Sequence, residues 1–347
     1  MPIFSMVIEL ADPTSYPGWD DYLRNQHFDV FHSAEWCRVI RSAYGYRPVY
    51  YVARENGRLK LLIPMFEISS LLTGKRAVSL PFTDFCSLVY ETEETFFQAV
   101  NKILFLGGKL GWKFVEFRDN QPLPGCKVVT TFYHHQLNLE PPAEAIWHTL
   151  KDTNQRNIKK AGKEGLRVKF DQTLHGLNLF YQLHLRTRKR HGLPAQPWSF
   201  FCRIQENLIG RNLGVVVLAM RKNQPVAASL YLYFNGRAIF KYGASDERYH
   251  QLRPNNLVMW EAILWLKSKG CRLLSLGRTD YNDQGLLAYK RQWGGQESLL
   301  SYSRYYFNDQ SEQPTAFREP HWLTRLLKKS PTWLIKMLGR IAYRHFG

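Results

Sequence analysis

The chain has 347 residues and a formal net charge of +18, with 45% hydrophobic and 14% aromatic residues. This composition excludes wholesale disorder, and roughly 150 residues per domain predicts two domains. Its five cysteines are odd in number and form no CxxC pair, which excludes a disulfide scaffold and a cysteine-based zinc site.

The first half predicts a helix, a β-hairpin, a second helix that ends at a glycine, and a strand. In chain order these are 34–44, 49–53 with 59–65, 96–110 before Gly111, and 112–117. The second half predicts helices over 143–150 and 200–209, then strands over 215–220, 227–234 and 238–242. A helix over 257–269 follows, stopped at Gly270 before a strand over 272–276.

The two halves therefore share one order of elements: helix, hairpin, further strand, helix, glycine, strand. Mixed sheets arranged in this way are typical of the GNAT acyltransferase fold, and two copies predict a tandem GNAT protein of the α/β class. Two unrelated α/β units are the alternative. We expect domains at 1–142 and 143–310, with Glu140-Pro141-Pro142 as the junction, and a helical tail at 311–347 behind a polar linker at 309–320.

Charge is distributed unevenly along the chain. Residues 1–150 carry a net charge of −2, whereas residues 151–347 carry +20. Such a field predicts an anionic partner for the second half, namely phosphates, nucleic acid or an acidic membrane surface, and a solvated basic face is the alternative.

Several motifs resemble those of the FemAB-like acyltransferases, in particular the subgroup associated with exosortase and exopolysaccharide systems. They are Thr153–Ala161 with Gly165, Thr187–Pro194, Gly277–Asp280, Ala288–Gly294, Phe31–Trp36 and Ser79–Phe85. The loop around Asp84 departs from the subgroup, because Phe85-Cys86-Ser87 stands where Tyr-Gly-Gly is usual. The resemblance covers nearly the whole chain and implies an acyl or aminoacyl transferase.

Lys290 is the first candidate catalytic residue. Acyl transfer to an amine develops an oxyanion, which a lysine can stabilise, and Tyr289 and Trp293 could exclude water from it. The resemblance implies this role for the lysine of the motif; a surface lysine is the alternative. Asp84 is the second candidate, since a carboxylate could orient or deprotonate the acceptor amine; an Asx turn or helix cap is the alternative.

Four further residues are candidate substrate contacts. Arg156 and Arg190 could bind phosphates through paired hydrogen bonds, or belong to a solvated face. Arg278 and Asp280 end a strand, which places them at the carboxyl edge of the sheet, where an ion pair between them is the alternative.

The acyl donor is expected to be aminoacyl-tRNA or acyl-CoA, with no bound cofactor and no metal. A CoA site of the usual kind needs a glycine-rich turn, whereas His250–Asn256 contains no glycine and includes Pro254, which favours aminoacyl-tRNA. Walker A, HExxH and GxSxG motifs are absent from the sequence.

The tail has an amphipathic pattern. Leu334, Met337, Leu338 and Ile341 share one helical face, flanked by Trp333 and Phe346, and basic residues lie opposite: Lys336, Arg340 and Arg344. This pattern predicts contact with an anionic membrane surface, or docking on the protein's own core.

We therefore predict an N-acyltransferase that modifies an amine of a phosphorylated or lipid-linked saccharide or peptide precursor of the cell envelope, of exopolysaccharide or peptidoglycan type. No apolar run reaches the ~18 residues of a membrane span, and the N-terminus lacks a basic signal region. We therefore expect the protein in the cytoplasm, at the inner face of the membrane. The alternatives are a protein that binds tRNA or other RNA, and a catalytically inactive scaffold of polysaccharide assembly. DNA is not an expected partner.

Overall fold

The computed structural model describes residues 7–24, 28–56, 58–123, 125–307 and 321–345, apart from the side chains of residues 321–323. The chain divides into two compact units. Unit 1 comprises Met1–Phe132, Leu299–Phe317 and Arg344–Gly347, and unit 2 comprises Tyr133–Ser298 and Arg318–Tyr343.

These units part at 132/133 and 298/299, and not at the expected boundaries after 142 and 310. The physical reason is that two long strands, β9 (Lys127–Asn138) and β15 (Gln296–Tyr306), each contribute residues to both units. The expected linker at 309–320 and the expected flanking residue Phe346 lie outside the described residues.

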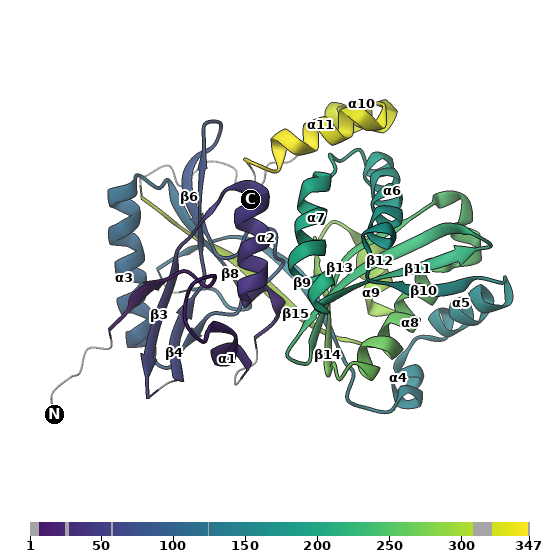
Figure 1. The fold of residues 1–347 in the computed structure, drawn as a ribbon, viewed down its shortest axis with the longest axis horizontal. Helices are drawn as coiled ribbons and strands as arrows, with labels where there is room; N and C mark the ends of the chain where they lie inside the picture. The colour runs from purple at the N-terminus through teal and green to yellow at the C-terminus, as the bar shows by residue number, and fades with distance from the viewer. Residues whose placement is uncertain (1–6, 25–27, 57, 124, 308–320, 346–347) are drawn as a thin grey trace. The chain divides into compact units, whose positions relative to one another are not determined.

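Unit 1 combines two sheets with two longer helices (Figure 1). Its strand orders are β1-β3-β4-β7 and β15-β8-β6-β5-β2. The strands are β1 (Glu9–Ala11), β2 (Arg47–Pro48), β3 (Tyr50–Glu55), β4 (Arg58–Ile63), β5 (Phe66–Ser70), β6 (Gly74–Val78), β7 (Val89–Tyr90) and β8 (Phe114–Asp119). The helices are α1 (Trp19–Arg24), η1 (Val30–His32), α2 (Ala34–Tyr44) and α3 (Glu93–Leu110).

Both longer helices of unit 1 have clear local stop and start signals. The Ser33 side chain accepts the N–H of Trp36 to cap α2, and Gly45 ends it at φ 74°. Thr92 caps α3 in the same way, and Gly111 ends it at φ 70°. The apolar face of α3 packs into a core with β4, β6 and β8.

Unit 2 has the strand order β10-β11-β12-β13-β14-β9. The strands are β10 (Arg167–Asp171), β11 (Gly214–Arg221), β12 (Gln224–Phe234), β13 (Arg237–Ser245) and β14 (Leu273–Thr279). The helices are α4 (Ala143–Thr149), α5 (Asp152–Lys163), α6 (Leu174–His191), α7 (Trp198–Asn207), η2 (Ile209–Arg211), η3 (Glu247–Leu252), α8 (Pro254–Ser268), α9 (Gln284–Arg291), α10 (His321–Lys329) and α11 (Thr332–Ala342).

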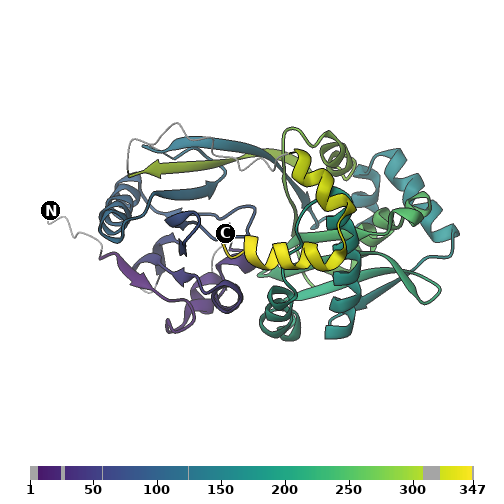
Figure 2. The same ribbon diagram turned by 90° about the horizontal axis from the view of Figure 1, so that it is seen from above.

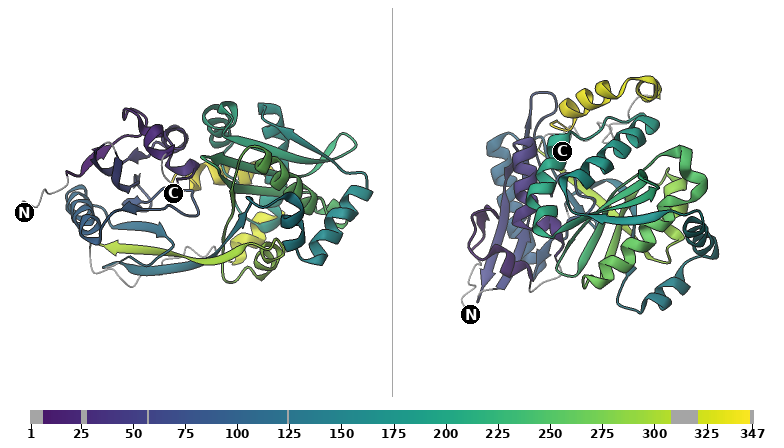
Figure 3. Two further views of the ribbon diagram at one scale, coloured as in Figure 1. Left: turned by 90° about the horizontal axis from the view of Figure 1, so that it is seen from below. Right: turned by 45° about the vertical axis from the view of Figure 1, so that its right-hand side comes forward.

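Helices cover both faces of the unit 2 sheet. Figures 1 and 3 show α6 on one face, and α8 with α5 beside it on the other. The larger core lies between α8 and the strands β11 to β14, where aliphatic side chains from both layers meet.

The predicted repeat is visible in the topology. In unit 1, β6 pairs in parallel with β8 and α3 lies between them in the chain; in unit 2, β13 pairs in parallel with β14 and α8 lies between them. The mixed α/β fold with two similar halves and a helical tail is thus confirmed.

The tail forms two helices, as expected. Helices α10 and α11 both pack on α6 (Figure 2). The inward face of α11 consists of Ile335, which is fully buried, and Gly339, whose hydrogens face the carbonyl of Ala195. Of the four residues expected on one apolar face, Met337 and Ile341 are exposed, whereas Leu334 and Leu338 are half-buried. Helix periodicity alone could not reveal that a glycine lies at the contact.

Candidate functional site

The strands β13 and β14 of unit 2 diverge. They pair only at Arg237 with Leu273, Ala238 with Leu274 and Ile239 with Ser275. Beyond these pairs β13 continues along β12 as far as Ser245, while β14 continues along β9 as far as Thr279. Separating two parallel strands opens the sheet at their carboxyl ends, where a ligand can approach backbone and side-chain groups from both strands.

Lys290 contacts β14 beyond the last residue that pairs with β13, and it is only 3% exposed. It comes from α9, which begins with a side-chain cap from Asp283, and its Nζ donates to the carbonyl oxygens of Gly277 (2.8 Å) and Arg278 (2.9 Å). Both acceptors belong to the part of β14 where pairing with β9 is irregular. The alternative of a surface lysine is therefore wrong: the ammonium is buried at an interruption of the sheet.

A buried hydroxyl lies next to the two carbonyls that Lys290 binds. Thr279 is 1% exposed, and its Oγ1 has no hydrogen-bond partner among the described residues. A buried hydroxyl without a partner costs free energy, so it marks a position where a ligand or water can bind.

Tyr289 and Trp293, which neighbour Lys290 in the sequence, pack in the core of unit 2. Trp293 is buried in the unit 2 core, Tyr289 packs against the same core, and their ring centroids lie 6.0 Å apart in an edge-to-face arrangement. Burial raises the pKa of Tyr289, so its hydroxyl stays neutral. The pair anchors the end of α9 to the core of unit 2.

Cationic side chains gather where β13 ends. Arg190, in the last turn of α6, has its Nη1 3.4 Å from Nε2 of His250, which lies 2.9 Å from the Ser245 hydroxyl. Arg186 and Arg248 both bind Asp246, and the hydrogen bond from Arg248 is the main reason that the Asp246 pKa falls to about 2. The end of β13 thus combines three arginines with one ionised carboxylate.

Arg156, Arg278 and Asp280 are all exposed. Arg278 lies near the end of β14 and Asp280 directly follows the strand, and the Asp280 carboxylate accepts the N–H of Asn282. Arg156 lies on α5. The neighbouring Asn154 bonds to Asn256 in the first turn of α8 and to the Gln292 carbonyl, so α5 is tied to the same end of the sheet.

Asp84, the remaining predicted residue, belongs to unit 1. It is half-buried in the loop between β6 and β7, and its carbonyl accepts the Tyr302 hydroxyl (2.9 Å). The loop includes two non-glycine residues at positive φ, Leu80 (45°) and Phe82 (62°). Such strained backbone persists only where the surroundings impose it, and it is common at functional sites.

A buried ion network holds this loop. Arg118 donates to the carbonyls of Leu80 (3.4 Å) and Thr83 (3.3 Å) and to the Glu116 carboxylate (2.9 Å), which Arg304 also binds (2.7 Å). Burial acts to raise the Glu116 pKa, but the two arginines outweigh it and hold the pKa below its usual value. The loop therefore rests on an ionised, fully paired support.

Asp119 is a candidate that the sequence prediction missed. It ends β8 and lines a cavity of about 550 Å³ together with Phe85, Ser87 and Leu88 of the loop that carries Asp84. Burial raises its pKa to about 6. A carboxylate with such a pKa is suited to proton transfer near neutral pH. The sequence offers only a weak indication of a functional role for Asp119, namely its position near the end of a strand. The burial of its carboxylate depends on residues 85–97.

The comparisons agree with this geometry. Residues 150–291 match the family model described as acetyltransferase (GNAT) domain. This range contains the diverging strands, the cationic cluster and Lys290.

Among solved structures the chain is similar to FemX, with a TM-score of 0.69 and 11% identity over 85% of this chain and 97% of that one. It is also similar to L-PGS from Bacillus licheniformis, with a TM-score of 0.54 and 11% identity over 96% and 99% of the chains. A tandem GNAT protein from the clavulanic acid biosynthesis pathway matches with a TM-score of 0.52 and 10% identity over 78% and 87%.

No curated protein matches the chain in sequence. At these identities the solved structures show the fold, and the FemAB-like tandem GNAT fold implied by the motifs is confirmed. The GNAT domain and the tandem fold together indicate an acyltransferase. Within the described residues, no group of three or more His, Cys, Asp and Glu side chains could hold a metal ion.

Proposed function

We propose that the chain transfers an acyl or aminoacyl group onto an amine of a phosphorylated cell-envelope precursor, and that the transfer takes place where β13 and β14 diverge. The observation that carries this proposal is the buried Lys290 ammonium, held on the part of β14 that extends beyond its pairing with β13, within residues 150–291. The proposed acceptor is a saccharide or peptide precursor of exopolysaccharide or peptidoglycan type.

Lys290 would stabilise the oxyanion of the tetrahedral intermediate. Its ammonium lies in a water-poor environment, where a fixed positive charge is far more effective than in bulk water. The two backbone carbonyls hold the ammonium in place before the substrate arrives, so little reorganisation is needed as negative charge develops.

The arginines at the end of β13 would bind phosphates of the donor or acceptor. Asp246 is engaged by Arg186 and Arg248, whereas Arg190 faces the neutral imidazole of His250, whose pKa is lowered by burial and by Arg190 itself. Arg190 is thus the best placed for a phosphate, with Arg156 as a second, exposed contact.

Backbone geometry favours aminoacyl-tRNA over acyl-CoA as the donor. In the segment after β13, the amides of Arg248, Tyr249, Arg253 and Asn256 already donate to acceptors within the segment, and Pro254 has no amide hydrogen. Few amides remain to cradle a pyrophosphate, so phosphate binding would depend on side-chain cations.

In unit 1, Asp84 would bind an amine-bearing substrate, and Asp119 would accept a proton from a group bound in the cavity that it lines. Both belong to the β6–β8 region, and the cavity that Asp119 lines is bounded by the loop that carries Asp84. A pKa near 6 leaves Asp119 ionised at neutral pH but still basic enough to take up a proton.

The test is a transfer assay with purified protein, radiolabelled aminoacyl-tRNA or acyl-CoA, and amine-bearing precursors. Lys290→Met should lower the turnover number by roughly 100-fold or more, the scale expected for loss of an oxyanion donor. Lys267→Met is the matched control. Lys267 also donates to two backbone carbonyls, Leu139 (2.8 Å) and Glu140 (3.0 Å), but it lies in the last turn of α8, away from the strand opening.

Equal activity of the two lysine variants at matched melting temperature would reject the catalytic role of Lys290. Labelled aminoacyl-tRNA that is bound and never consumed would instead favour the RNA-binding alternative.

We also propose that α11 contacts the inner surface of an anionic membrane. No helix among the described residues is long and apolar enough to span a bilayer. However, Trp333, Met337 and Ile341 recur every fourth residue on the outward side of α11, and Trp333 is 63% exposed. Exposed basic residues, Lys336, Arg340 and Arg344, accompany this stripe, which suits an interfacial helix.

The prediction is that vesicles containing phosphatidylglycerol sediment the protein and that phosphatidylcholine vesicles do not. Trp333→Ser combined with Met337→Ser should abolish the part of binding that persists at high salt, because that part comes from apolar contact. Leu71→Ser with Leu72→Ser, which replaces two exposed apolar residues of unit 1, is the control. Identical sedimentation of all variants would refute membrane contact through α11.

A further inference from the structure

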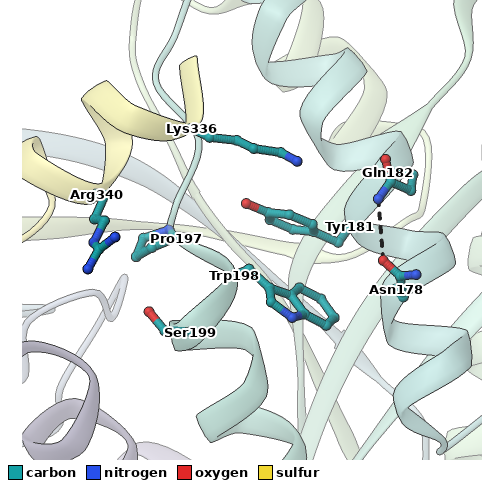
Figure 4. Close-up of a pocket in the computed structure, with 8 residues that line it drawn as sticks. All are labelled: Asn178, Tyr181, Gln182, Pro197, Trp198, Ser199, Lys336 and Arg340. Carbon is teal, nitrogen blue, oxygen red and sulfur yellow. Dashed lines mark hydrogen bonds between the residues drawn. The ribbon is translucent and has the colours of Figure 1, made fainter. Parts of the chain in front are cut away.

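A second concave surface of unit 2 lies outside the strand opening. It is a cavity of about 540 Å³, within the ~300–1,000 Å³ typical of small-molecule sites. Figure 4 shows its lining, to which α6, α7 with the residue before it, and α11 all contribute: Asn178, Tyr181, Gln182, Pro197, Trp198, Ser199, Lys336 and Arg340.

The charged side chains that line this cavity are cationic. Lys336 and Arg340 lie one turn apart on α11, and both are exposed. Among the described residues that line the cavity none carries a carboxylate, and none of the described ion pairs involves either cation. Two adjacent cations without a counter-charge favour a phosphate or a similar anion.

The rest of the lining is aromatic and amide in character. The rings of Tyr181 and Trp198 lie 4.9 Å apart; Tyr181 is nearly buried and Trp198 is half-buried. The Tyr181 hydroxyl already donates to the Gln196 carbonyl, so these residues offer mainly ring surface. Gln182 donates to Asn178 (3.3 Å), and the pair retains further donors and acceptors for hydroxyl groups. Ring faces beside amides suit a sugar, whose C–H faces pack on aromatic rings.

Close helix packing fixes the two cations over the aromatic wall. A side chain at Gly339 would overlap the Ala195 carbonyl, so only glycine lets α11 approach the segment that leads into α7. Lys336 and Arg340 lie on either side of Gly339, and the Lys336 Nζ is 6.0 Å from the centre of the Tyr181 ring. The cavity therefore depends on this contact between two distant parts of the sequence.

We infer that this cavity binds a glycosyl phosphate, with the phosphate on Lys336 and Arg340 and the sugar against Trp198 and the Asn178–Gln182 amides. The inference rests on the proposed function only for the class of ligand, since a phosphorylated saccharide precursor would present a glycosyl phosphate. It assigns the recognition of that group to a surface separate from the part of β14 that holds Lys290.

The experiment is calorimetric titration of the full chain with glucose 1-phosphate, glucose and inorganic phosphate as probes. Glucose 1-phosphate should bind, and each of the other two should bind at least about tenfold more weakly. Lys336→Ala combined with Arg340→Ala should weaken glucose 1-phosphate binding by tenfold or more. Trp198→Leu should remove the preference for glucose 1-phosphate over phosphate.

The matched control is Lys328→Ala with Lys329→Ala. It removes the same charge from exposed residues of the neighbouring helix α10 that do not line the cavity, and it should leave binding unchanged. Equal weakening in both double variants, or equal affinity for phosphate and glucose 1-phosphate, would overturn the inference in favour of a nonspecific basic surface.

Two further measurements separate the sources of the ligand and the two proposals. Displacement of glucose 1-phosphate by phosphatidylinositol vesicles but not by phosphatidylcholine vesicles would assign a lipid-borne headgroup, and no displacement would assign a soluble sugar phosphate. Lys290→Met should keep glucose 1-phosphate affinity. Failure of glucose 1-phosphate to bind while Lys290→Met still abolishes transfer would overturn this inference and leave the proposed function intact.

Discussion

Replacing Asp119 with asparagine should change how stability depends on pH. Burial raises the Asp119 pKa to about 6 in the folded chain, against the lowering effect of the Asn120 and Leu88 amides, whereas the carboxyl titrates near 3.8 when unfolded. The folded chain therefore binds this proton more tightly than the unfolded chain does. Stability from this group is present at low pH and is lost as the pH rises from about 4 to about 6.

The size of the effect follows from the two pKa values. At about 1.4 kcal/mol per pKa unit, the difference between about 6 and 3.8 corresponds to ~3 kcal/mol of destabilisation above pH 7. The side-chain amide of the variant would keep one acceptor for the Asn120 amide but lose the other, which costs about 1 kcal/mol at every pH. Asp119→Asn should thus be ~2 kcal/mol more stable than the parent at pH 8, and no more stable, or slightly less, at pH 4.

Urea denaturation followed by circular dichroism at pH 4, 5, 6, 7 and 8 measures this difference. Asp246→Asn is a control of opposite sign. Its pKa is lowered to about 2, chiefly by hydrogen bonding to Arg248, so the variant should lose ~2 kcal/mol at pH 7 and less as the pH falls below 4. A stability difference between Asp119→Asn and the parent that stays constant from pH 4 to pH 8 would refute the assignment of a raised pKa.

Two other predictions concern stability. Gly339→Ala should destabilise the chain by about 1–3 kcal/mol and make α11 sensitive to protease, because overlap with the Ala195 carbonyl outweighs the gain of about 1 kcal/mol in helix propensity. The control is Gly108→Ala, which lies in open space on α3 and should stabilise the chain. Equal effects of the two substitutions on stability would contradict this packing. Burial lowers the pKa of His184 to about 3, so the imidazole stays neutral in the fold and stability falls as the pH drops below 6.5. His184→Phe should remove this dependence, gaining roughly 3 kcal/mol on the parent between pH 7 and pH 4 in urea denaturation, and parallel pH profiles would count against it.

Local signals predicted many of the elements well. The helix over 34–44 has the expected bounds, since Ser33 caps its start and Gly45 adopts the left-handed conformation at its end. The helices before Gly111 and Gly270, and the strands after them, were also expected. These features depend on a few neighbouring residues, so a single sequence can reveal them.

Features that depend on contacts between residues distant in the sequence could not be predicted from the sequence alone. The burial of Lys290 requires α9 to lie against the irregular part of β14, and the pKa of Asp119 requires the loop after β6 to cover it. In the tail, the close contact with the segment before α7 is made by Gly339, which carries no hydrophobic signal and so could not be predicted from the apolar pattern. The roles of the predicted site residues stay predictions.

Unit 1 is assembled from separate stretches of the chain, and this constrains how it folds during synthesis. Strand β8 has β6 on one side and residues 301–306 of β15 on the other, so one edge of its sheet stays open until the ribosome has passed residue 306. At 5–20 residues per second, the interval after Asp119 is roughly 10–40 s. The unit also receives residues from the end of the chain, where the His345 carbonyl accepts from Arg76 and Thr73. Neither unit can therefore be exchanged between relatives by joining two gene segments at a single point. During synthesis the unpaired edge of β8 is exposed, so we expect the nascent chain to bind chaperones.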